Sequence, residues 1–125
     1  KSFIAASATG FYGPDRTARS FTENADHYDD FLGRTCYKWE EASNTAKGRF
    51  RTAIIRIGIV LGKEAGAFKE FEKPTSFGVV PILGSGKQVI SWIHVEDLAA
   101  LFTYAVEQES IAGIYNGVAP NPASK

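Results

Sequence analysis

Three hydroxyl-bearing residues, Ser7, Thr9 and Tyr12, lie at the end of the first apolar stretch of the chain, residues 2–8 (SFIAASA). The stretch lacks polar alternation, which is typical of a strand buried on both faces in a parallel sheet. Ligands of open α/β sheets bind at the carboxyl ends of such strands. The three hydroxyl groups are therefore candidates for contact with a ligand.

Arg56 is the unusual residue of the second apolar stretch, residues 52–61 (TAIIRIGIVL). An isolated cation inside a protein is costly unless it is paired. We therefore expect Arg56 either to lie at an end of the sheet or to pair with a carboxylate.

A helix is predicted between these two strands, from about Asp29 to Ala46. Asp29 or Asp30 can supply the oxygen that caps its first turn. Apolar residues recur at steps of three and four and define one face: Leu32, Cys36, Trp39, Ala42 and Ala46. We interpret Trp39 as packing against the sheet and Cys36 as a small buried hydrophobic residue.

The rest of the chain predicts a strand at 89–93, an amphipathic helix at 96–107 and a strand at 113–118, with a weaker helix at 67–72 and loop over 76–88. His94 is expected to order the start of the second long helix. Buried strands joined by a helix indicate a right-handed crossover in an α/β sheet. Two buried strands do not make a sheet alone, so we expect the chain to be part of a larger one.

Composition and motifs exclude several classes of function. The 125 residues are 44% hydrophobic and 22% charged, as in globular domains. Fourteen basic and fourteen acidic residues give no net charge, which argues against nucleic-acid binding. No apolar run approaches the roughly 18 residues of a membrane span. Two histidines and one cysteine argue against a metal site.

Nucleotide-binding and nucleophilic signatures are also missing from the chain. Residues 81–88 (PILGSGKQ) share only a Gly-Lys pair with a phosphate-binding P-loop. Pro81 stands where such a loop needs glycine, and Gln88 stands where it needs Ser or Thr. No glycine-rich dinucleotide turn follows a strand, and no spacing of Ser, His and Cys suggests a triad.

Five segments in order do carry a family resemblance: ASATGFYG at 6–13, RIGIVLG at 56–62, GSGKQ at 84–88, SWIHVEDL at 91–98 and YNGVAP at 115–120. This set resembles the extended short-chain dehydrogenases/reductases, which are NAD-dependent epimerase/dehydratase-like proteins. It is most similar to the sugar-nucleotide epimerase-like proteins of the atypical class. The resemblance places the chain in the C-terminal part of such a protein.

The resemblance implies an α/β fold that is the C-terminal portion of a doubly wound, Rossmann-like parallel sheet, with part of a small substrate domain. Residues 1–62 would complete the cofactor-binding domain, 63–93 would belong to the substrate domain, and 94–125 would return to the sheet. It further implies NAD or NADP as cofactor and a small-molecule substrate, either a nucleotide sugar or another carbonyl or hydroxyl compound. A homodimer and a cytoplasmic location complete this expectation.

The chain departs from the family at the residues that move protons. Family enzymes use a tyrosine, a lysine four residues later that lowers the phenol pKa, and a serine or threonine on the preceding strand. Here Cys36 and Glu40 occupy the tyrosine and lysine positions, and a carboxylate would repel a phenolate. Ile90 stands where sugar-nucleotide epimerases carry a diphosphate-binding arginine.

The resemblance nonetheless implies a set of site residues. The catalytic candidates are Ser7, Thr9, Tyr12 and Tyr37. The candidates for cofactor binding are Ser7, Ala8, Thr9, Arg56, Gly58 and Ile59. The candidates for substrate binding are Tyr12, Trp92 and His94. The alternative hypothesis is a cofactor-binding protein with weak catalysis that serves as a redox sensor or as a partner-binding module.

Overall fold

A three-stranded parallel sheet forms the centre of the computed structural model, which describes residues 1–14, 20–64, 78 and 88–124. Its strands are β1 (Ser2–Ala8), β2 (Arg51–Ile57) and β6 (Gly113–Gly117), in the spatial order β1-β2-β6. The core lies in β2, where Ala53, Ile54 and Ile55 are fully buried. The expected α/β architecture is confirmed, while the helix predicted at 67–72 falls outside the described residues.

The parallel register of the sheet aligns three polar residues in one row. Ser7 of β1 pairs with Arg56 of β2, and Arg56 pairs with Asn116 of β6. Residues paired in this way point to the same face of a pleated sheet. The row lies near the carboxyl ends of all three strands, which is the edge where ligands of α/β sheets bind.

The helix α1 (Phe31–Asn44) packs on β1 and β2, with the Asp30 side chain accepting a hydrogen bond from the Gly33 N–H at 2.7 Å as the predicted cap. The prediction that the apolar residues of α1 face the sheet is wrong. The helix buries Gly33, Glu40 and Ser43, whereas Trp39 is 61% exposed. Glu40 faces inward because the buried cation Arg56 requires a carboxylate.

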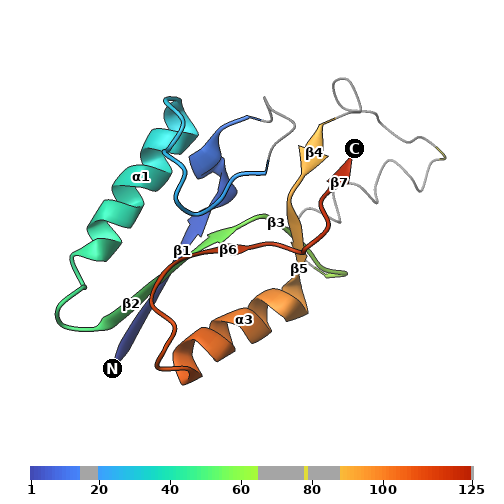
Figure 1. Cartoon of the computed structure of the whole chain (residues 1–125). Helices are drawn as coiled ribbons and strands as arrows, with labels where there is room; N and C mark the ends of the chain where they lie inside the picture. Colours follow the sequence, from blue (N-terminus) through green and yellow to red (C-terminus); the bar gives the residue numbers. More distant parts are fainter. Residues whose placement is uncertain (15–19, 65–77, 79–87, 125) are drawn as a thin grey trace.

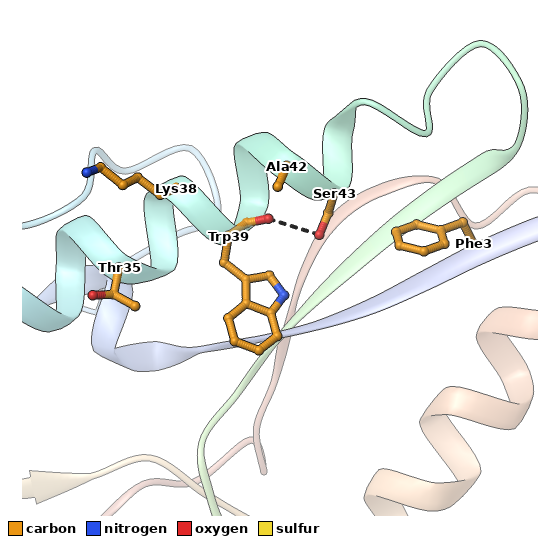
Figure 2. Close-up of a pocket in the computed structure, with 6 residues that line it drawn as sticks. All are labelled: Phe3, Thr35, Lys38, Trp39, Ala42 and Ser43. Atoms are coloured by element: carbon orange, nitrogen blue, oxygen red, sulfur yellow. Dashed lines mark hydrogen bonds between the residues drawn. The ribbon is translucent and has the colours of Figure 1, made fainter.

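Two of the apolar residues of α1, Trp39 and Ala42, line an open surface cavity of about 470 Å³. Figure 2 shows Trp39 and Ala42 on the helix, with Phe3 of β1 at one end of the cavity. Helical periodicity alone finds the apolar face of a helix, but it does not reveal which face the neighbouring elements cover.

The helix α3 (Val95–Glu107) lies on the opposite side of the sheet from α1 (Figure 1). As expected, His94 orders its start, because its Nδ1 accepts a hydrogen bond from the Glu96 N–H at 3.2 Å. Arg51, at the start of β2, holds the other end by donating to the carbonyl groups of Ala105, Val106 and Ile111. No helix in the described part of the chain is both long enough and apolar enough to cross a bilayer.

The predicted strand at 52–61 divides in two at Gly58, which donates its N–H to Gly117. Its second part, β3 (Ile59–Leu61), leaves the main sheet and pairs in parallel with β5 (Trp92–His94). A second small ribbon joins β4 (Val89–Ile90) to β7 (Ala123–Ser124) in antiparallel fashion. The predicted strand at 89–93 is therefore two short strands, β4 and β5, which belong to two separate sheets.

A substitution at Gly58 tests whether the division between β2 and β3 depends on close backbone packing. A Cβ atom at Gly58 would lie 2.6 Å from the backbone oxygen of Ser91, whereas one at Gly10 would meet the Leu32 side chain at an ordinary 3.5 Å. We expect Gly58→Ala to lower the free energy of unfolding by about 1–3 kcal/mol, as overpacking does. Urea denaturation of the intact protein measures it.

Gly10→Ala is the matched control and should leave the urea midpoint unchanged or raise it slightly, because alanine reduces the freedom of the unfolded chain. If both variants were destabilised equally, the close approach of the Ser91 backbone would not be the reason that position 58 requires glycine.

Candidate active site

A buried ion pair between Arg56 of β2 and Glu40 of α1 lies at the centre of the candidate site. Arg56 is 2% exposed and Glu40 is 4% exposed. The guanidinium binds the carboxylate through two hydrogen bonds, from Nε to Oε1 at 2.8 Å and from Nη2 to Oε2 at 2.9 Å. This confirms the expectation that Arg56 pairs with a carboxylate, and such bidentate geometry is the strong form of the interaction.

The surroundings of Arg56 keep it charged. Burial alone would lower the pKa of Arg56, but hydrogen bonds to Glu40 and Tyr12 and the charge of Glu40 raise it above its usual value. The guanidinium also stacks on the ring of Phe11, with its central carbon 3.5 Å from the ring centroid. It is therefore a fixed cation held between a carboxylate and an aromatic face.

Hydrogen bonds extend from this pair to both neighbouring strands. Ser7 Oγ donates to Glu40 Oε1 at 2.7 Å. On the other side, Arg56 Nη1 donates to the Tyr12 hydroxyl at 3.0 Å, and that hydroxyl donates to Asn116 Oδ1 at 2.6 Å. Five side chains from five elements, among them the short 3₁₀ helix Thr9–Tyr12, thus form one continuous chain, which we call the polar row network: Ser7, Glu40, Arg56, Tyr12 and Asn116.

The segment at residues 20–28 crosses the carboxyl edge of the sheet and is tied to this network. The Glu23 carbonyl accepts from Arg56 at 3.2 Å, and the Glu23 carboxylate accepts from the backbone N–H of Asn116 at 3.0 Å. The ring of Phe21 stacks on Tyr12 with centroids 5.3 Å apart. This segment therefore packs on the site instead of extending into solvent.

A cavity of about 800 Å³ opens beside the network. Tyr12, Asn116 and Thr9 line it with polar groups, and Phe21 and Ile59 add apolar surface. Concave sites of this volume, with a few polar groups on largely apolar walls, are the usual form of small-molecule sites. The carboxyl edge of the sheet thus presents a cavity and a rigid polar network together.

The structure brings together some of the predicted site residues and separates others. Ser7, Tyr12 and Arg56 belong to the polar row network, and Thr9 and Ile59 line the cavity. The remaining ones lie outside the network: Ala8, which pairs with Ile57; Gly58, at the division between β2 and β3; Trp92, whose Nε1 donates to the Asn121 carbonyl; and His94, which caps α3.

Tyr37 lies apart from the network on the exposed side of α1. Its ring stacks on His27 with centroids 4.4 Å apart. The hydrogen bond to Glu41, together with the charge of Glu41 and desolvation, raises the pKa of Tyr37. A raised pKa makes this phenol harder to ionise. Of the two candidate phenols, only Tyr12 belongs to the polar row network and lines the cavity of about 800 Å³.

Sequence reasoning missed Glu40, Asn116 and Glu23 as parts of the site. Glu40 was expected to oppose catalysis, and Asn116 was noted only within a motif. The signal for Glu40 was the unpaired cation in a buried strand, which requires an acidic partner on the covering helix. The signal for Asn116 was the strand pairing, which follows once the parallel register is known.

The Glu40–Arg56 pair should contribute far more to stability than an exposed pair does. Removing one partner of a buried ion pair strands the other charge and costs about 3–5 kcal/mol. We therefore expect Glu40→Ala to lower the unfolding free energy of the intact protein by about that amount in urea denaturation.

The matched control is Asp29→Ala, which removes the partner of Arg34 from a surface pair whose side chains are 54% and 86% exposed. Such pairs contribute about 0–1 kcal/mol. If both variants unfolded at the same urea concentration, the buried pair would have no special structural role.

The chain matches the family model described as NAD dependent epimerase/dehydratase family over residues 1–116. It is 41% identical over 119 residues to the epimerase family protein SDR39U1 homolog, chloroplastic, of Arabidopsis thaliana, which covers 95% of this chain and 34% of that protein. The chain therefore spans about a third of that relative's length.

Two solved structures are similar as well. The human epimerase family protein SDR39U1 (isoform 2) with NADPH has a TM-score of 0.91 and 33% identity, covering 99% of this chain and 42% of the human one. The nucleoside-diphosphate sugar epimerase from Corynebacterium glutamicum has a TM-score of 0.87 and 38% identity, covering 97% and 26%. Fold, motifs and the extent of the family match agree, and the chain belongs to the NAD dependent epimerase/dehydratase family.

Proposed function

We propose that this chain forms part of an NAD(P)-binding protein with epimerase- or oxidoreductase-type activity, whose reacting site lies at the carboxyl ends of β1, β2 and β6. The observation that carries the proposal is the polar row network beside the cavity of about 800 Å³. A rigid set of polar groups at this edge of a parallel sheet is the arrangement that α/β enzymes use.

The residues at the end of β1 are chemically suited to a nicotinamide nucleotide. Ser7 and Thr9 offer hydroxyl groups, and Ala8 leaves space beside them because it carries only a methyl group. When bound, such a cofactor supplies hydride transfer. The human relative crystallised with NADPH supports NADP as the first cofactor to test, with NAD as the alternative.

Tyr12 is the phenol that we propose as the reacting hydroxyl. It is 5% exposed, it lines the cavity, and it accepts a hydrogen bond from a cation at 3.0 Å. A donor aimed at an oxygen stabilises negative charge that develops there. Arg56 would thus perform part of the task that a lysine on the helix performs in the family pattern.

The substrate that we propose is a small hydroxyl or carbonyl compound. The relative from Corynebacterium glutamicum, named as a nucleoside-diphosphate sugar epimerase, makes a nucleotide sugar one candidate. Trp92 and His94 remain proposed as substrate contacts, and residues 1–62, 63–93 and 94–125 as the cofactor, substrate and returning parts. A homodimer and a cytoplasmic location also belong to the proposal; the single cysteine favours a reducing compartment.

A second candidate function is cofactor binding with weak catalysis, as in a redox sensor or partner-binding module. The observation that favours it is the ion pair itself, because Glu40 neutralises Arg56, the cation that donates a hydrogen bond to the Tyr12 hydroxyl. A neutral pair stabilises a developing phenolate less than a free lysine would.

Single-turnover spectroscopy of the intact protein with NADPH separates the two functions. We expect NADPH to bind and to be oxidised by at least one member of a carbonyl panel. Tyr12→Phe should bind NADPH like the wild type but turn over about 10²- to 10⁴-fold more slowly, which is the usual contribution of a proton-transfer group.

Tyr37→Phe is the matched control, since it removes the same hydroxyl from the phenol outside the network, and it should leave the rate unchanged. Tight NADPH binding without hydride transfer to any carbonyl would support the second function. A larger loss of rate from Tyr37→Phe than from Tyr12→Phe would overturn the choice of Tyr12.

A further inference from the structure

The proton of the Tyr12 hydroxyl is directed at a neighbouring side chain. Arg56 Nη1 can only donate, so the phenol oxygen accepts a hydrogen bond from it at 3.0 Å. The phenol proton then goes to Asn116 Oδ1, which lies at a short distance of 2.6 Å. The group that we propose as the reacting hydroxyl is therefore already engaged as a donor within the protein.

Asn116 is held in the orientation that receives this proton. Its backbone N–H donates to the Glu23 carboxylate at 3.0 Å, and its side-chain nitrogen faces the Phe21 carbonyl at 3.5 Å. Reversing the amide would bring its oxygen against that carbonyl oxygen, which is repulsive, and would leave the Tyr12 proton facing an N–H group. The segment at 20–28 therefore keeps Oδ1 turned toward Tyr12.

Both partners of this hydrogen bond line the cavity of about 800 Å³. Tyr12 is 5% exposed and Asn116 is half-buried, so a ligand in the cavity meets the two polar groups side by side. A phenol has one proton to donate. A ligand oxygen that receives the Tyr12 proton must therefore compete for it with Asn116 Oδ1.

We propose that Asn116 is a positioning residue that withholds the Tyr12 proton from a neutral ligand and releases it to an oxygen that gains negative charge. The inference rests on the proposed function for the location of the ligand and the role of Tyr12. It adds the residue that decides when the proton is available.

The energetic argument compares two acceptors for one donor. A neutral carbonyl oxygen is similar to the amide oxygen of Asn116, so replacing one acceptor by the other gains little free energy. An oxygen that becomes negative during reaction forms a hydrogen bond roughly twice as strong. Interactions that strengthen in the transition state raise the rate, whereas uniform binding raises only the affinity. Asn116 thereby reserves the Tyr12 hydrogen bond for the transition state.

The test compares acetophenone with α-methylstyrene, two molecules of the same shape that carry a carbonyl oxygen and a methylene group at the same place. Their dissociation constants are measured by ligand-observed NMR on the intact protein without NADPH. We expect Asn116→Leu to shift the ratio of the two constants about three- to tenfold in favour of acetophenone, because the Tyr12 proton becomes available to its oxygen.

Tyr12→Phe completes a double-mutant cycle, which isolates the coupling between the two side chains. Added to Asn116→Leu, it should cancel the gain, because the proton that the ketone receives is then missing. In the wild-type background it should leave the ratio unchanged. A gain of affinity that depends on Tyr12 does not arise from a loss of structure, so the cycle distinguishes positioning from a merely structural role.

Two matched controls change the amide in other ways. Asn116→Asp keeps an acceptor beside Tyr12, and Asn24→Leu makes the same replacement at an exposed residue that does not line the cavity. Neither should show the gain for acetophenone. With NADPH bound, Asn116→Leu should lower KM for a ketone substrate and leave kcat unchanged, as an increase in uniform binding does.

An unchanged ratio in Asn116→Leu, a gain that survives Tyr12→Phe, or binding of neither probe overturns the inference. If Asn116→Leu does not fold, Tyr12→Phe in the wild-type background decides alone, since weaker binding of acetophenone would show that the proton is already available. Failure of the proposed function appears instead as absent NADPH binding in a fluorescence titration. The ratio is read without NADPH, so the two failures are distinguishable.

Discussion

The buried pair of Arg56 and Glu40 is the interaction on which the carboxyl edge of this sheet depends. Either side chain alone would be a stranded charge in the interior, and the cost of that state is large. Together they join the central strand β2 to the helix α1 and fix the rotamers of both residues. Ser7, Tyr12 and the segment around Glu23 then take their positions from these two fixed groups.

The pair also determines where the charges of the network lie. The family pattern places a positive charge on the helix, four residues after a tyrosine. In this chain the helix carries the negative charge of Glu40, and the positive charge is on the strand at Arg56. The phenol that contacts the cation is Tyr12, which follows β1.

The fold could be predicted from the sequence wherever a local pattern was compatible with only one structure. The unbroken apolar stretches at 2–8 and 52–61 predicted strands, and their parallel pairing followed from the helix between them. Burial on both faces is confirmed for β2 but is wrong for β1, in which only Ala5 is buried. The sequence also indicated that a buried Arg56 would need a carboxylate partner. The identity of the partner was not, because Glu40 lay on a helix whose apolar residues suggested the opposite orientation.

The same limit applies to the site. Ser7 and Tyr12 could be located because Ser7 lies at the end of the first apolar stretch and Tyr12 follows it closely. Asn116 could not, since its place depends on which residue of β2 it pairs with, and pairing across distant strands has no local signal. Trp39 shows the converse error: a large apolar residue at helical spacing was assigned to the core, yet it lies on the surface beside Phe3.

The alignment of Ser7, Arg56 and Asn116 in one row has a consequence for how the chain folds. If β2 slipped by a single residue against its neighbours, every side chain of the strand would turn to the other face of the sheet. Arg56 would then enter the apolar layer beneath α3, far from any acid on α1. The register shown by the sheet is thus the one in which the guanidinium keeps its carboxylate partner, and a shift of β2 by one residue would leave that charge unpaired.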